Sequence, residues 1–128
     1  MTLILDAGAV TALAGRRAQL QELLDRGLWP AQVPAVVLAA ALTGDHRRDF
    51  NANRLLRACQ IREVDVTIAR EAARLRTATG RAGSISAVDA VVAAHAQTCP
   101  DAIVLTSDPD DLAALTLHTA SPVAVLAV

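Results

Sequence analysis

Three aspartates stand where a carboxylate could do chemistry. Asp6 ends the apolar run LILD, Asp108 follows the apolar run AIVLTS, and Asp89 interrupts the apolar segment AVDAVVAA. Carboxylates that share one cleft repel one another, so a divalent cation is the group that would hold them together. Ligation by oxygen alone suits Mg²⁺ or Mn²⁺, which keep water molecules in their coordination shell. The three aspartates are therefore candidate metal ligands.

Helix capping is the alternative role for these acids. Asp108 stands before a proline, as an N-cap residue does, and Asp111 lies where a capping-box acid belongs. Ser86 and Asp89 fit the same capping pattern, and Asp6 precedes a predicted helix. Capping is weakest as an account of Asp89, whose neighbours are apolar, and it does not explain why two strands both end in an acid. The combination favours a metal site.

Strands and helices alternate along the chain in a way that can bring these acids together. Short apolar or alternating runs predict strands at residues 3–6, 31–33, 60–66, 102–106 and 122–128. Helical periodicity predicts helices at residues 7–15, 18–26, 34–43, 46–59, 67–79, 86–97 and 107–115. Within 46–59, Phe50, Leu55, Leu56 and Cys59 are expected on the buried face. This order predicts a single domain, residues 1–128, with a mainly parallel sheet flanked by helices, whose ligands bind beyond the carboxyl ends of the strands.

Composition limits the class of protein. Hydrophobic residues make up 53% of the 128, but no apolar run approaches the roughly 18 to 20 residues of a membrane-spanning helix. The start, MTLILDAGAV, carries an acid and no basic residue, so we expect no signal peptide. Cys59 and Cys99 fit no metal or redox spacing. We expect a cytoplasmic protein that does not contact a membrane.

Charge is divided unevenly along the chain. All twelve basic residues are arginines between Arg16 and Arg81, whereas the segment from residue 82 onward carries five aspartates and no basic residue. Acids without counter-charges in an apolar segment favour a bound cation. The absence of lysine excludes a P-loop. It also excludes phosphotransfer folds of the receiver and haloacid-dehalogenase types, and the latter need an acid at the position of Gly8.

Four segments in this order and spacing resemble a known family. LILDAGAV, VPAVVLA, AVDAVVAA and VLTSDPDDL are similar to segments of the PIN-domain toxins of bacterial VapBC toxin–antitoxin systems. The resemblance covers nearly the whole chain and implies a PIN-like three-layer α/β sandwich. It also implies Mg²⁺- or Mn²⁺-dependent endoribonuclease activity, inhibition by a cognate antitoxin, and a homodimer.

The resemblance also implies roles for individual residues. Asp6, Asp89 and Asp108 match the first, third and fourth acids of the family's metal site. Asp111 resembles an accessory acid near that site, and Thr106 or Ser107 could position a ligand water. The implied mechanism is hydrolysis of an RNA phosphodiester by a metal-activated water.

The family's second acid is where this chain departs. The family has glutamate where PAVVLAAALTG has Ala40, and Asp45 lies beyond Gly44 on a different side of the helix axis. Two origins are open: a deliberate exchange of glutamate for alanine, or a natural branch with a degenerate second position. DAGAV lacks the Thr-Ser hydroxyls that many relatives carry after Asp6, which favours the natural branch. We expect weak activity that is better with Mn²⁺ than with Mg²⁺.

The remaining polar and aromatic residues give less specific predictions. Arginines near the cleft could track an RNA backbone, although each could also be an ordinary solvated side chain; they are Arg47, Arg48, Arg74, Arg76 and Arg81. His95 is not expected to share a metal with Asp89. Trp29 and Phe50, the only aromatic residues, suit core packing or a protein contact better than base stacking.

The alternative function is a catalytically impaired PIN-fold module that still binds an antitoxin or RNA.

Overall fold

Five parallel strands form one sheet in the order β3-β2-β1-β4-β5 in the computed structural model, which describes residues 1–128. The strands are β1 (Thr2–Leu5), β2 (Gln32–Pro34), β3 (Gln60–Arg62), β4 (Ala102–Thr106) and β5 (Val123–Ala127). The apolar runs of β1 and β4 occupy the centre, in register from Thr2 opposite Ala102 to Leu5 opposite Leu105. The predicted parallel sheet is therefore confirmed, and its two central strands are those that lead to an acid.

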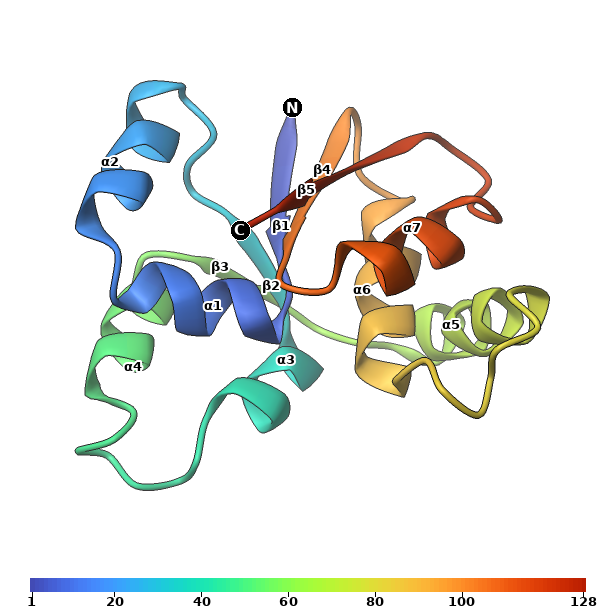
Figure 1. Cartoon of the computed structure of the whole chain (residues 1–128), viewed down its shortest axis with the longest axis horizontal. Coiled ribbons are helices and arrows are strands. Elements are labelled where there is room, and N and C mark those ends of the chain that lie inside the picture. The colour runs from blue at the N-terminus through green and yellow to red at the C-terminus, as the bar shows by residue number, and fades with distance from the viewer.

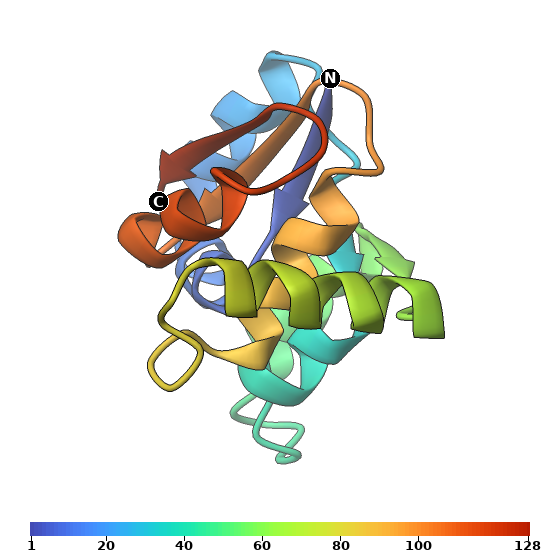
Figure 2. The same ribbon diagram turned by 90° about the vertical axis from the view of Figure 1, so that its right-hand side faces the viewer.

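Helices cover both faces of this sheet (Figure 1). One face carries α1 (Ala7–Ala14), α2 (Arg17–Asp25) and α4 (Phe50–Arg57), and the other carries α5 (Val66–Ala78), α6 (Ala87–Ala96) and α7 (Pro109–Thr116). The short helix α3 (Ala35–Ala41) continues from β2 at the carboxyl ends of the strands. Figure 2 shows α5 lying across α6 on the second face. This arrangement is the predicted three-layer α/β sandwich.

The helix α6 is buried from Ala90 to Ala96, as its apolar sequence predicts. It contacts β1, β2 and β4 on its inner side and α5 and α7 on its outer side. Val92 and Ala93 are completely buried between these elements. Only the first turn of α6, which contains Asp89, emerges at the carboxyl edge of the sheet.

The helix predicted from residue 46 begins later than expected. Residues 46–49 form a turn, and α4 starts at Phe50, whose side chain is 61% exposed instead of buried. The cause is Asp49, whose carboxylate accepts hydrogen bonds from the N–H groups of Thr43 (2.9 Å) and Gly44 (2.9 Å). These bonds close residues 43–49 into a loop, so residues 46–49 are not helical although their sequence continues the helical pattern.

The predicted strand 60–66 is also shorter than expected. β3 contains only Gln60–Arg62, and all three residues are exposed because β3 is the edge strand beside β2. The chain then reaches Asp65, whose carboxylate caps α5 by accepting from Ile68 N at 2.8 Å. None of the seven helices has the length and apolar composition of a membrane-spanning segment.

Candidate functional site

The carboxyl ends of β1 and β4 bring Asp6 and the segment Thr106–Asp108 to one edge of the sheet. The two strands are hydrogen-bonded neighbours, and Asp6 N donates to Leu105 O at 3.3 Å. The start of α1, the helix α3 and the first turn of α6 lie at this same edge (Figure 1). The topology therefore gathers the predicted acids as the alternation of strands and helices implies.

Asp6 is almost fully buried, with 2% of its surface exposed. One carboxylate oxygen caps α1 by accepting from Ala9 N at 2.7 Å, and the other accepts from the Thr106 hydroxyl. The Thr106 hydroxyl oxygen in turn accepts from Asp108 N at 2.8 Å. Thr106 thus links Asp6 to the backbone of Asp108, and Asp6 performs the capping role that the sequence left open.

Three carboxylates form the cluster from which a metal could take ligands. Asp89, Asp108 and Asp111 each offer one oxygen, and these oxygens lie within 4.8 Å of one another. Opposite ligands of an octahedral Mg²⁺ are about 4.2 Å apart, so small side-chain adjustments bring this set into range. Asp111 therefore joins Asp89 and Asp108 in the cluster, while the oxygens of Asp6 remain with α1 and Thr106.

Burial and the charge of neighbouring acids both raise the pKa of carboxyl groups in the cluster. Burial is the largest cause that raises the pKa of Asp89 to about 6, and the negative charges of Asp6, Asp108 and Asp111 contribute to the same rise. Burial and the neighbouring Asp111 carboxyl also raise the pKa of Asp108. Four acids thus act on one another at this edge, and a divalent cation would neutralise the repulsion. The donor set fits Mg²⁺ or Mn²⁺.

The capping patterns predicted at the starts of α6 and α7 have different outcomes. Ser86 caps α6 by accepting from Asp89 N at 3.0 Å, so the Ser86–Asp89 pattern is used as predicted. Asp108 occupies the N-cap position of α7 but makes no side-chain cap hydrogen bond. Its carboxylate is left for the cluster.

Ser107 and Gly8 meet where α1 approaches the turn between β4 and α7. A Cβ added to Gly8 would lie 1.7 Å from Ser107 Oγ and 2.5 Å from Ser107 Cβ. Glycine at position 8 therefore makes room for the Ser107 side chain beside the start of α1. The sequence shows that position 8 carries neither an acid nor a hydroxyl, but it does not predict this contact, which depends on the sheet topology.

Ala40 lies exposed on α3, which packs against α6. Asp45 does not replace the missing acid, because its carboxylate accepts from Arg47 N at 2.9 Å within its own turn. Asp49, a buried acid that the sequence analysis overlooked, is occupied by Thr43 and Gly44. The Thr43 backbone N–H is the main cause of its lowered pKa.

A family model decides the classification of this chain. The model described as PIN domain matches residues 3–116. The chain belongs to the PIN domain family. No curated protein sequence matches it.

Solved structures agree with this PIN domain in fold. DNA-bound VapBC from Salmonella typhimurium superposes with a TM-score of 0.72 at 12% identity, covering 99% of this chain and 98% of that one. FitAcB from Neisseria gonorrhoeae gives 0.65 at 20% identity, covering 98% and 96%. VapBC2 from Rickettsia felis, bound to a promoter DNA fragment, gives 0.65 at 15% identity, covering 100% and 99%.

The five arginines predicted to follow RNA differ in what they contact. Arg74 donates to Glu71 and to His118 O, and Arg76 donates to Ile85 O at 2.6 Å. Arg47 and Arg48 are exposed without an ion-pair partner. Arg81 pairs with Asp111 at 2.6 Å and so reaches the acidic cluster of the PIN domain.

His95 and the cysteines lie outside the acidic cluster. The His95 ring shares a hydrogen bond of 2.7 Å with Gln32 Oε1, and Cys99 Sγ is 3.7 Å from the same ring nitrogen. Burial, followed by the positive charge of Arg62, lowers the pKa of His95. Both cysteines are free and half-buried, and burial raises the pKa of Cys59 to about 11. These groups do not contribute to the cluster.

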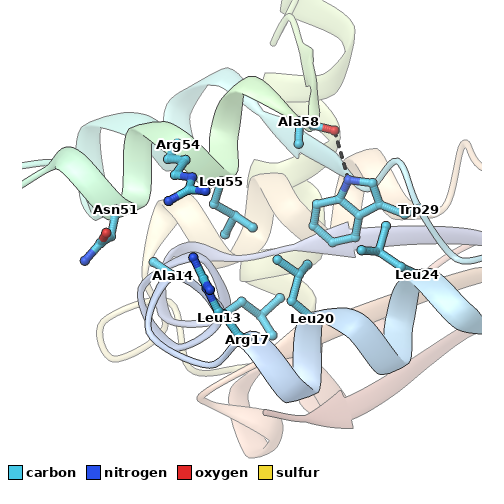
Figure 3. Close-up of a pocket in the computed structure, with 10 residues that line it drawn as sticks. All are labelled: Leu13, Ala14, Arg17, Leu20, Leu24, Trp29, Asn51, Arg54, Leu55 and Ala58. Atoms are coloured by element: carbon cyan, nitrogen blue, oxygen red, sulfur yellow. Dashed lines mark hydrogen bonds between the residues drawn. The ribbon is translucent and has the colours of Figure 1, made fainter.

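An apolar groove of about 380 Å³ lies on the other flank of the PIN domain, between α1, α2 and α4 (Figure 3). Trp29 forms part of its wall and donates its indole N–H to Ala58 O at 3.0 Å. Arg17 and Arg54 also line it. The other lining residues are Leu13, Ala14, Leu20, Leu24, Asn51, Leu55 and Ala58.

Proposed function

We propose that this PIN domain is a metal-dependent endoribonuclease toxin of a toxin–antitoxin module. The observation that carries the proposal is the convergence of Asp89, Asp108 and Asp111 at the carboxyl edge of a PIN fold, with Asp6 held directly beside them by Thr106. The raised pKa of Asp89 supports it, because a carboxylate that is half-buried beside other carboxylates suits a site that a divalent cation neutralises.

The chain's residues have separate roles in the proposed reaction. Asp89 and Asp108 would hold Mg²⁺ or Mn²⁺, and Asp111 would supply a further ligand. A metal bound there would polarise the scissile phosphate and lower the pKa of a bound water. Asp6 supplies negative charge to the same edge, while Thr106 keeps its carboxylate in place. Ser107 follows Thr106 at the carboxyl end of β4, and its hydroxyl would help to position a water bound to the metal. Arg47 and Arg48, free of ion pairs, are available for RNA phosphates.

The proposed partners are a cognate antitoxin and a second copy of the chain, in the cytoplasm. The structures named VapBC that share this fold are the basis for the antitoxin. The groove beside Trp29 offers an apolar floor with Arg17 and Arg54, which suits an antitoxin segment that carries both apolar and acidic side chains.

The test measures Mn²⁺-dependent cleavage of RNA and the Mn²⁺-dependent shift in melting temperature. We expect slow cleavage and a positive shift for the wild type, and the loss of both in the double variant Asp6→Asn/Asp108→Asn. Asp110→Asn is the matched control, because Asp110 lies in the first turn of α7 but contributes no oxygen to the cluster. It should keep both properties.

The two proposed measurements also separate the nuclease from a binding module. A chain that binds Mn²⁺ but leaves every RNA intact would be the catalytically impaired module, with Ala40 as the physical reason for the loss. A chain whose melting temperature does not respond to Mn²⁺, and which does not cut RNA, would contradict the metal site itself.

A further inference from the structure

The ion pair between Arg81 and Asp111 differs from the other two ion pairs of the chain. Arg26–Glu22 and Arg74–Glu71 each join neighbouring turns of one helix. Arg81 instead reaches from the loop between α5 and α6 to α7, thirty residues further along, where its guanidinium lies 2.6 Å from Asp111 Oδ1. Since Asp111 belongs to the three-carboxylate cluster, this is the one guanidinium paired with the proposed metal ligands.

The backbone of Arg81 is fixed while its side chain remains half exposed. Arg81 N donates to Thr79 Oγ1 at 3.0 Å, and Arg81 O accepts from Ser84 N at 2.9 Å and Ile85 N at 3.0 Å. Gly80, with a φ of 70°, starts this loop in the left-handed region. The side chain keeps 46% of its surface exposed. A long side chain on a fixed base can exchange one anionic partner for another nearby.

Charge decides which partner Arg81 keeps. A divalent cation on the cluster and the guanidinium of Arg81 are two positive groups that compete for the carboxylate of Asp111. The guanidinium fork binds a phosphate as well as it binds a carboxylate. Arg74 and Arg76, from the helix before the loop, are held by Glu71 and by Ile85 O. Arg81 is therefore the arginine of this region that is best placed to change partner.

We propose that Arg81 is an exchangeable counter-cation of the acidic cluster, which neutralises Asp111 in the metal-free chain and contacts an RNA phosphate in the metal-loaded chain. The inference rests on the proposed metal-dependent nuclease and assigns this residue a role in both metal affinity and substrate binding. It predicts that removing the guanidinium changes the two affinities in opposite directions.

The experiment compares the wild type, Arg81→Gln and Arg81→Lys by calorimetric titration with Mn²⁺ in the absence of RNA. Arg81→Gln should bind Mn²⁺ about two- to fivefold more tightly, the size expected from losing a half-exposed ion pair. Arg81→Lys, which keeps the charge, should stay near the wild type. Arg70→Gln is the matched control, because Arg70 is an exposed arginine of α5 with no ion pair.

RNA cleavage at saturating Mn²⁺ supplies the second readout. The KM of Arg81→Gln should rise, and the slope of log KM against log salt should fall by about 0.7, as expected for one lost contact to single-stranded RNA. Arg81→Lys should show a smaller rise in KM because it keeps a point charge without the fork.

Unchanged or weaker Mn²⁺ binding by Arg81→Gln would overturn the counter-cation role, since a purely structural arginine gives no gain in metal affinity. An unchanged KM would overturn the phosphate contact. A wild-type chain with no affinity for Mn²⁺ would instead overturn the proposed function, and this inference with it.

Discussion

Ala40 is the residue whose exchange tests the acidic edge most directly. It is exposed on α3, which packs against the helix that carries Asp89, so a longer side chain has room there. We expect Ala40→Glu to raise the rate of RNA cleavage on the order of 10- to 100-fold, because an added carboxylate orients metal-bound water. The ratio of Mn²⁺- to Mg²⁺-supported rates should fall in the same variant.

The control for this exchange is Ala39→Glu, which adds the same charge at the preceding exposed position, about 100° around the helix. It should leave the rate near that of the wild type. Equal rates for Ala40→Glu and the wild type would show that position 40 does not contribute to the reaction.

At the residue scale, the sequence indicates which acids converge but not which pairs they form. Asp6, Asp89 and Asp108 are predictable because each stands at the end of a strand or in an apolar helix, and parallel strands bring such positions to one edge. The pairing of Arg81 with Asp111 joins residues 30 positions apart. It depends on how the loop after α5 folds, which local residue patterns do not encode.

At the scale of elements, the close approach of α1 to the turn after β4 depends on Gly8. Alanine is the better helix former by about 1 kcal/mol, but its Cβ would lie 1.7 Å from Ser107 Oγ and 2.5 Å from Ser107 Cβ. The second contact is not with a flexible chain end, so the backbone must shift. We expect Gly8→Ala to lower the free energy of unfolding by about 1–3 kcal/mol, measured by urea denaturation.

Two further variants check the cause of this destabilisation. Gly8→Ala/Ser107→Gly removes the opposing side chain and should recover most of the lost stability. Gly15→Ala adds a methyl group at the end of α1 with no atom within 4 Å, and it should not destabilise the chain by a comparable amount. If Gly8→Ala is as stable as Gly15→Ala, the contact with Ser107 is not restrictive.

The elements that sequence patterns predicted well are those that a continuous apolar face defines. The buried strands β1 and β4 and the helix α6 lie where their apolar runs placed them. The loop before α4 was missed because its structure comes from one side chain: Asp49, 5% exposed, turns back to Thr43 and Gly44. A single polar side chain that folds back on the backbone leaves no periodic pattern in the sequence.

At the scale of the whole molecule, the acidic edge has a cost for folding. The segment after residue 81 carries five acids and no basic residue, and three of those acids form the cluster, with Asp6 beside it. Of the twelve arginines, only Arg81 pairs with a member of the cluster. The fold therefore keeps negative charges together that would separate on unfolding, as sites that serve a function often do.

Asp89 makes this cost measurable. Its pKa is about 6 in the folded chain against a usual value of 3.8, mainly because of burial. A carboxyl with a raised pKa stabilises the fold fully when protonated, below about pH 4, and this stabilisation is lost as the pH rises through about 6. Two pKa units correspond to about 3 kcal/mol, which screening at this half-exposed site reduces to the order of 1–2 kcal/mol.

In EDTA, Asp89→Asn should therefore be more stable than the wild type by on the order of 1–2 kcal/mol at pH 7, and the two should converge below pH 4. Urea denaturation from pH 4 to pH 8 measures the difference. The backbone N–H that Ser86 caps is kept in this variant, and Asp110→Asn controls for the removal of one negative charge. Saturating Mn²⁺ should reduce or reverse the difference, because only the wild type keeps the full set of carboxylates. A difference that does not vary between pH 4 and pH 7 would contradict the raised pKa of Asp89, and with it the burial of this carboxyl beside other acids that supports the metal site.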